Sequence, residues 1–209
     1  PGMVYLSHPT EYGTLYTKNE LQAIKGVCAQ YGAPLYLDGA RLGYGLAAEN
    51  TDVTLKVLAE ICDAFYIGGT KVGALFGEAL VLPRPGLIPH FFSIIKQNGA
   101  LLAKGRALGI QFDTLFTDGL YEKLGRHAVR LAMQLRQGLE RAGRKAWIDS
   151  PTNQQFFVLE NSEIERISKM VGFSLWEPLD QGHAVVRLAT SWASQEEDIA
   201  RLIELLQSK

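Results

Sequence analysis

The chain has 209 residues, 47% of them hydrophobic and 21% charged, with a formal net charge of −1; this composition excludes a disordered chain, and the balance of 21 basic against 22 acidic residues gives no indication of nucleic-acid binding. No apolar run reaches the roughly 18 residues of a membrane span, so we expect no membrane partner. The two cysteines, Cys28 and Cys62, are too few for a disulfide framework and predict a protein of a reducing compartment, the cytoplasm.

The first part of the chain alternates strand and helix patterns. Apolar residues 3–6 predict a strand, and because the chain opens on Pro1 directly before it, we expect sequence to be missing upstream. Thr17 and Glu20 form a capping box that predicts the start of a helix. Further along, the patterns predict a buried strand over 33–37, a helix over 54–62, and strands over 64–67 and 79–82. This alternation predicts an α/β fold with a largely parallel sheet.

The second part is first helical and then mixed. Residues 88–116 predict helix interrupted by glycines, and residues 120–142 predict a long amphipathic helix with an apolar stripe from Leu124 to Leu139. After Gly143 the patterns predict strands over 145–148, 155–159, 173–176 and 184–189, with helices over 162–171 and 194–206. We therefore expect a large domain over residues 1–142 and a small α+β domain over residues 143–209.

A carboxylate stands at the carboxyl end of one predicted strand, in Asp38-Gly39-Ala40-Arg41. Ligands of open parallel sheets gather beyond this edge, and a carboxylate buried there needs a partner. By itself the tetrapeptide also fits an Asp that caps the following turn. The motif is therefore a candidate ligand-binding site with a structural alternative.

A lysine and an arginine follow in comparable positions. Lys71 is the last residue of the motif Gly68-Gly69-Thr70-Lys71. In this position it can act as an amine nucleophile toward carbonyls, or it can be a solvated turn residue. The spacing of the glycines and the lysine does not match a phosphate-binding P-loop. Arg187 lies within an apolar strand and suits either bidentate carboxylate binding or a buried structural ion pair. Together with Asp38, these residues suit a pyridoxal phosphate (PLP) enzyme, which needs a Schiff-base lysine, a carboxylate for the pyridinium nitrogen and a cation for the substrate carboxylate.

The sequence resembles the threonine aldolases, within the β-eliminating lyase group of fold-type-I PLP-dependent enzymes. The resemblance covers nearly the whole chain and is carried by the strand and DGARL motif at 34–42, the Gly68–Lys71 strand end, and the segments 7–14, 104–109 and 186–190. It implies part of the large PLP-binding domain, a mostly parallel sheet with helices, followed by a small C-terminal α+β domain. It also implies an amino-acid substrate and a homodimer or homotetramer.

The resemblance assigns cofactor-binding roles to four residues. Asp38 would pair with the pyridine nitrogen, and Lys71 would form the Schiff base. Arg41 would contact the phenolic oxygen of the cofactor, and Thr70 would help to hold its phosphate.

The resemblance also implies substrate contacts. Arg187 would bind the substrate carboxylate, and His8 falls where family members carry an active-site histidine near the reacting hydroxyl. Lys104 and Arg106 would reach the site of a neighbouring subunit. No metal site is expected.

The implied reaction is retro-aldol cleavage of threonine or allo-threonine to glycine and acetaldehyde. Family members are longer, and their N-terminal region supplies the phosphate loop and the side chain stacked on the cofactor ring. We therefore expect the C-terminal portion of such a carbon–carbon lyase, which can lack activity by itself. Two alternatives stay open, namely another fold-type-I reaction such as β-elimination or transamination, and a non-catalytic truncated PLP-fold module.

Overall fold

The computed structural model describes residues 2–207. These residues form two compact units, the first made of residues 2–8, 16–43 and 52–121 and the second of residues 9–15, 44–51 and 122–207. The predicted domain boundary after residue 142 differs from this division, because helix α6 (Leu120–Arg141) packs with the second unit from Glu122 onward. Within residues 2–207, no helix is both long and apolar enough to cross a bilayer.

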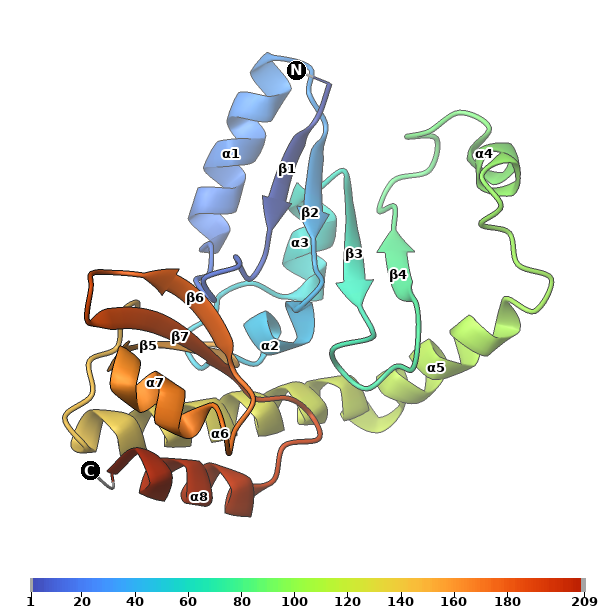
Figure 1. Cartoon of the computed structure of the whole chain (residues 1–209). Coiled ribbons are helices and arrows are strands. Elements are labelled where there is room, and N and C mark those ends of the chain that lie inside the picture. The colour runs from blue at the N-terminus through green and yellow to red at the C-terminus, as the bar shows by residue number, and fades with distance from the viewer. Residues whose placement is uncertain (1, 208–209) are drawn as a thin grey trace. The chain divides into compact units, whose positions relative to one another are not determined.

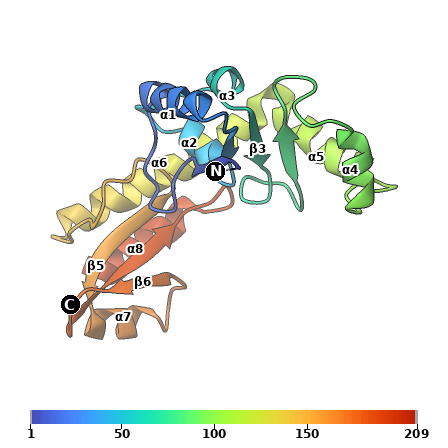
Figure 2. The same ribbon diagram turned by 90° about the horizontal axis from the view of Figure 1, so that it is seen from above.

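The first unit is built on a four-stranded sheet of order β1-β2-β3-β4 (Figure 1). Its first three strands are parallel and the fourth is antiparallel to the third: β1 (Val4–Ser7), β2 (Leu35–Asp38), β3 (Ala64–Gly68) and β4 (Glu78–Val81). The crossover helices α1 (Lys18–Gln30) and α3 (Leu55–Ile61) lie side by side on one face of this sheet (Figure 2). The predicted largely parallel sheet is confirmed, and so is the capping box of Thr17 and Glu20 at the start of α1.

The two central strands of this sheet bury their large apolar side chains on one face. Leu35 and Leu37 of β2 and Phe65 of β3 are at most 2% exposed, whereas Tyr36 and Tyr66 at the alternate positions are half-buried. Side chains alternate across a strand, so the tyrosines share the face opposite to the apolar one. The strand predicted as buried at 33–37 buries its leucines on one face, while its other face carries Tyr36 and ends in Asp38.

Asp63, just before β3, ties the amino ends of the strands together. It is 8% exposed and accepts hydrogen bonds from Lys25 Nζ at 2.5 Å, from the Arg84 guanidinium and from Leu35 N at 2.7 Å. Burial alone would raise the pKa of Asp63, but these donors hold it below its ordinary value. Asp63 is thus an ionised anchor at the edge opposite to Asp38.

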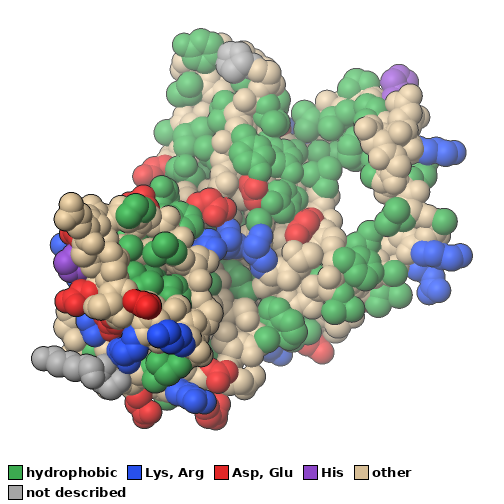
Figure 3. All heavy atoms as spheres, in the orientation of Figure 1, with side chains coloured by type: hydrophobic (Ala, Val, Ile, Leu, Met, Phe, Trp, Pro, Cys, Tyr) green, Lys and Arg blue, Asp and Glu red, His purple; other side chains and the backbone are tan. Residues whose placement is uncertain are grey.

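The segment of residues 82–116, here called the apolar arm, is the least covered part of the first unit. Its helix α4 (Phe91–Gln97) has no buried residue, and α5 (Arg106–Phe116) buries only Leu115. Hydrophobic side chains gather on it in the space-filling view (Figure 3); those exposed are Leu87, Ile88, Phe92, Ile94, Leu101, Leu102, Ile110 and Phe116. The 3-10 turn Thr117–Gly119 links the arm to α6.

The second unit is an antiparallel sheet of order β5-β7-β6 packed against helices. Its strands are β5 (Gln154–Glu160), β6 (Ser174–Pro178) and β7 (His183–Ala189), and its helices, besides α6, are α7 (Asn161–Ile167) and α8 (Glu196–Gln207). Leu131 and Leu135 of α6 pack with Phe157, Val186 and Leu202 in the core, which confirms the predicted apolar stripe. The strand predicted over 145–148 is wrong, since only Ala146 forms an isolated bridge, to Phe157.

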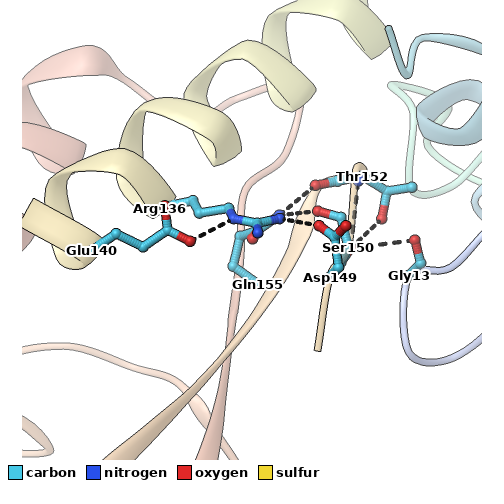
Figure 4. A network of polar contacts seen from close by, with 7 residues as sticks. All are labelled: Gly13, Arg136, Glu140, Asp149, Ser150, Thr152 and Gln155. Carbon is cyan, nitrogen blue, oxygen red and sulfur yellow. Dashed lines mark hydrogen bonds and ion pairs between the residues drawn. The ribbon is translucent and has the colours of Figure 1, made fainter. Parts of the chain in front are cut away.

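A polar network fixes the chain just before β5 (Figure 4). Arg136 of α6 donates to Asp149 Oδ1 at 2.5 Å, and Ser150 Oγ donates to Gly13 O at 3.2 Å. Gln155 Nε2 donates to Ser150 O at 3.0 Å. These bonds tie residues 9–15 to the rest of the second unit and fix the start of β5, which pairs with the strand of Arg187.

Candidate active site

Asp38 ends β2 at the carboxyl edge of the parallel strands. Its Oδ1 accepts hydrogen bonds from the Tyr66 hydroxyl and, at 2.9 Å, from Ala40 N, while its Oδ2 accepts from the Tyr5 hydroxyl. Burial by itself raises the pKa of this carboxyl, but the three donors and the charge of Lys71 hold the pKa below its ordinary value. Asp38 is therefore an oriented and ionised carboxylate at neutral pH, and its bond to Ala40 also gives it the turn-capping role.

Two glycines allow the ends of β2 and β3 to meet. Gly68 N donates to Gly39 O at 2.9 Å. A Cβ on Gly39 would lie 1.9 Å from Tyr66 O, and one on Gly68 would lie 2.3 Å from Ala40 O. A side chain at either position would push the strand ends apart, so the glycines of both motifs are required by this close approach.

Lys71 lies in the exposed turn that follows β3. The turn is anchored by the buried Val72, whose N–H donates to Gly69 O at 2.9 Å, and by the Tyr121 hydroxyl, which donates to Gly68 O at 2.9 Å. The charge of Lys71 contributes to the lowered pKa of Asp38. The fold therefore brings the predicted lysine and carboxylate into one electrostatic neighbourhood.

Two other residues predicted to contact the cofactor lie on the same loops. Arg41 is half-buried between β2 and α2 (Leu42–Leu46). Thr70 is exposed, and its hydroxyl donates to Glu78 Oε1 at 2.9 Å. Since a hydroxyl has one proton to donate, phosphate binding by Thr70 would require it to give up this partner.

His8 follows β1, and its backbone N–H donates to Asp38 O at 2.9 Å. Its side chain is fully buried, Nδ1 accepts from Tyr16 N at 3.4 Å, and Nε2 has no partner among residues 2–207. Burial lowers the pKa of His8 to about 4. The ring is therefore neutral at pH 7, carries its proton on Nε2 and is a weak proton acceptor.

Arg187 of β7 is held by neutral partners in the second unit. Its Nη1 donates to Gln154 Oε1 at 3.2 Å, its Nη2 donates to Ser174 Oγ at 3.1 Å, and the guanidinium carbon lies 5.1 Å from the Trp176 ring centroid. Within the part of the chain that the structure describes, no carboxylate pairs with it and its Nε has no partner. The structural ion pair considered from the sequence is absent there, and this uncompensated charge suits an anionic ligand.

The remaining predicted residues lie on the apolar arm. Lys104 is exposed in the turn before α5, and the exposed Arg106 begins that helix. Among the described residues, no group of three or more His, Cys, Asp or Glu side chains is arranged to hold a metal ion.

Sequence reasoning missed the side chains that hold the predicted ones. Tyr5 and Tyr66 hold Asp38, Gln154 and Ser174 hold Arg187, and Glu78 binds the residues before Lys71. Period-two alternation places Tyr36 on the face of Asp38 and could have indicated a tyrosine-lined surface. The partners themselves depend on the strand register, which sequence does not give.

The sequence model of the family described as beta-eliminating lyase matches residues 1–198. The chain belongs to this family. It is 30% identical over 206 residues to the low specificity L-threonine aldolase of Pseudomonas aeruginosa, which covers 98% of this chain and 58% of that protein. A structure of threonine aldolase from Leishmania major is 44% identical with a TM-score of 0.95, covering 99% of this chain and 60% of that one. The chain thus spans about three-fifths of the length of these relatives.

The fold is shared more widely than the family. A variant of the Thermus thermophilus aspartate aminotransferase is 18% identical with a TM-score of 0.68, covering 97% of this chain and 55% of that one. The predicted resemblance to threonine aldolases and the predicted fold of fold-type-I PLP enzymes are confirmed. The beta-eliminating lyase family is PLP-dependent.

Proposed function

We propose that this chain supplies the lysine-bearing part of a PLP-dependent aldolase that cleaves threonine or allo-threonine to glycine and acetaldehyde. The observation that carries the proposal is the ionised Asp38 at the end of β2 beside the Lys71 turn at the end of β3. Relatives that are 30% and 44% identical and are described as threonine aldolases support the same reaction.

The residues at this edge of the sheet fit PLP. Asp38 accepts two hydrogen bonds on Oδ1 and one on Oδ2, so Oδ2 has acceptor capacity left for a protonated ring nitrogen. When bound, PLP supplies an electron sink for the pair released at the substrate Cα. Lys71 would provide the amine that reacts with the cofactor aldehyde, and Arg41 would contact its phenolic oxygen. The Thr70 hydroxyl lies on the same loop, but its proton is already donated to Glu78 Oε1.

Arg187 would bind the α-carboxylate of the substrate. Its two hydrogen bonds to Gln154 and Ser174 use two of the five guanidinium N–H groups, which leaves enough donors for a bidentate carboxylate. The proton of the β-hydroxyl would pass to a water or to His8. The low pKa of His8 favours the water as base and leaves the Nε2–H of His8 as a hydrogen-bond donor.

The apolar arm supports a homodimer or homotetramer. Its exposed hydrophobic side chains would be covered by a second copy of the chain. Besides Arg84, which pairs with Asp63, the arm contains Lys96, Lys104 and Arg106 and has no acidic residue over 82–112, so it would face an anionic group of the partner subunit. In this arrangement Lys104 and Arg106 would reach the neighbouring site. The buried free thiols of Cys28 and Cys62 fit the reducing cytoplasm.

The reaction is tested by incubating the protein with PLP and L-threonine or L-allo-threonine and following acetaldehyde with alcohol dehydrogenase and NADH. We expect acetaldehyde and glycine in equal amounts, and none from the Lys71→Ala variant. Pyruvate from serine would instead indicate β-elimination, and an oxo acid would indicate transamination. PLP retention without any product, from this chain and from any longer product of the same gene, would indicate a non-catalytic module.

A further inference from the structure

Glu78 of β4 binds the two residues that directly precede Lys71. Its Oε2 accepts a hydrogen bond from Gly69 N, and its Oε1 accepts one from the Thr70 hydroxyl at 2.9 Å. In the antiparallel pairing of β3 and β4, Glu78 lies opposite Gly68. One carboxylate on the neighbouring strand therefore holds the start of the Lys71 turn by two bonds.

The backbone at Gly69 is buried and tightly enclosed, whereas Lys71 is exposed. A Cβ on Gly69 would lie 2.7 Å from Gly77 O and 2.8 Å from Phe112 Cζ. A buried N–H in such a position needs a hydrogen-bond acceptor, and Glu78 provides it. Glu78 is therefore one of the anchors that set the direction of the turn, together with the buried Val72 and the Tyr121 hydroxyl.

Glu78 also belongs to the polar group around Asp38. Burial, the hydrogen bond to Asp38 and, as a smaller contribution, the charge of Glu78 all raise the pKa of Tyr66. Tyr66 therefore stays protonated and continues to donate to Asp38. Glu78 thus binds the strand end that carries Lys71 and adds only a small electrostatic contribution at Tyr66.

We propose that Glu78 is a positioning residue, which sets the direction of Lys71 by holding the Gly69 amide and the Thr70 hydroxyl. The inference rests on the proposed function, in which Lys71 reacts with the cofactor aldehyde. In this arrangement the Thr70 hydroxyl donates its proton to Glu78, so the cofactor phosphate would be held by other groups.

Three variants separate this role from a general effect on folding. Glu78→Ala removes both bonds. Glu78→Gln keeps them, because its amide oxygen can accept from Gly69 N while its amide nitrogen donates to Thr70 Oγ1. Glu60→Ala removes an exposed carboxylate from α3 and is the matched control.

Two readouts are used, and the first needs no cofactor. Hydrogen exchange at the Gly69 amide should be at least about tenfold faster in Glu78→Ala than in the wild type, since a hydrogen bond to a charged group is lost. Exchange in Glu78→Gln and Glu60→Ala should stay close to wild type. The second readout is borohydride-trapped PLP on Lys71, relative to Lys56 in the same digest, which should fall in Glu78→Ala and recover in Glu78→Gln.

Unchanged exchange and labelling in Glu78→Ala would overturn the inference, and so would a Glu78→Gln variant that behaves like Glu78→Ala. If the wild type itself is not labelled at Lys71 while exchange follows the expected order, the proposed function fails and the positioning by Glu78 stands. If circular dichroism shows that Glu78→Ala does not fold, Thr70→Val replaces it, and this removal of one bond should give an intermediate increase in exchange.

Discussion

Replacing Gln154 by glutamate would place a carboxylate beside Arg187 with almost no change of side-chain shape. Gln154 Oε1 accepts from Arg187 Nη1 at 3.2 Å, and no carboxylate within residues 2–207 pairs with this guanidinium. The Gln154→Glu side chain should therefore form an internal ion pair where a neutral amide now lies. A substrate carboxylate would then approach an arginine whose charge is already compensated.

The size of the effect follows from Coulomb's law. A substrate carboxylate about 6 Å from the new carboxylate would be repelled by about 2.8 kcal/mol at an effective dielectric constant of about 20. Because Arg187 is only half-buried, screening by salt reduces this to roughly 2 kcal/mol, or about 30-fold in affinity. The carboxylate contact is equally strong in the ground state and the transition state, so KM should rise while kcat stays within about threefold.

The assay is steady-state cleavage of threonine by the wild type, Gln154→Glu and Gln154→Met. The methionine variant removes the hydrogen bonds of Gln154 to Arg187 and to Glu11 O without adding charge, so its KM should change by only about threefold. Inhibition by 1-amino-2-propanol, an amine without a carboxylate, should be equal in all three proteins. A KM for Gln154→Glu within threefold of wild type would refute the assignment of Arg187 as the carboxylate-binding residue.

Three further predictions concern titratable groups. Tyr66→Phe removes one donor from Asp38 and should raise the pKa of that carboxyl, as measured by carbon-13 NMR; an unchanged pKa would contradict the assigned hydrogen bond. Asp63→Asn should lower the free energy of unfolding in urea by about 2 kcal/mol at pH 7, less than for a fully buried pair because Arg84 is half-exposed. Folding lowers the pKa of Asp63, so the contribution of Asp63 to the free energy of unfolding is complete above the unfolded pKa and should disappear as pH falls through the folded pKa. A difference in the free energy of unfolding between wild type and variant that persists in strong acid would contradict this. His8 should titrate near pH 4 in proton NMR, and because the folded state resists its protonation, the free energy of unfolding should decrease as pH falls from about 6.5 toward 4; a midpoint near 6.5 would show that the ring is not buried.

Features that depend on neighbouring residues were predictable from the sequence. The capping box of Thr17 and Glu20 and the stripe from Leu124 to Leu139 follow from local hydrogen bonding and helical periodicity, and both occur in the structure. Pairing across the sheet was not predictable in the same way. The antiparallel direction of β4 and the failure of residues 145–148 to form a strand depend on pairing with another segment of the chain.

The same distinction applies to the candidate site. Asp38, Lys71 and Arg187 were found because charged residues next to apolar runs and glycines are visible in sequence. The groups that orient them were missed because each acts across strands: Tyr5 reaches Asp38 from β1, and Gln154 reaches Arg187 from β5. The register between strands decides these contacts, and a single sequence does not specify it.

The most direct test of the account is to mix the protein with PLP, reduce it with borohydride and map the modified peptide by mass spectrometry. The ionised Asp38 beside the Lys71 turn predicts a pyridoxyl adduct on Lys71. A folded protein that carries no adduct at Lys71, in this chain and in any longer product of the same gene, would contradict the assignment of the cofactor site.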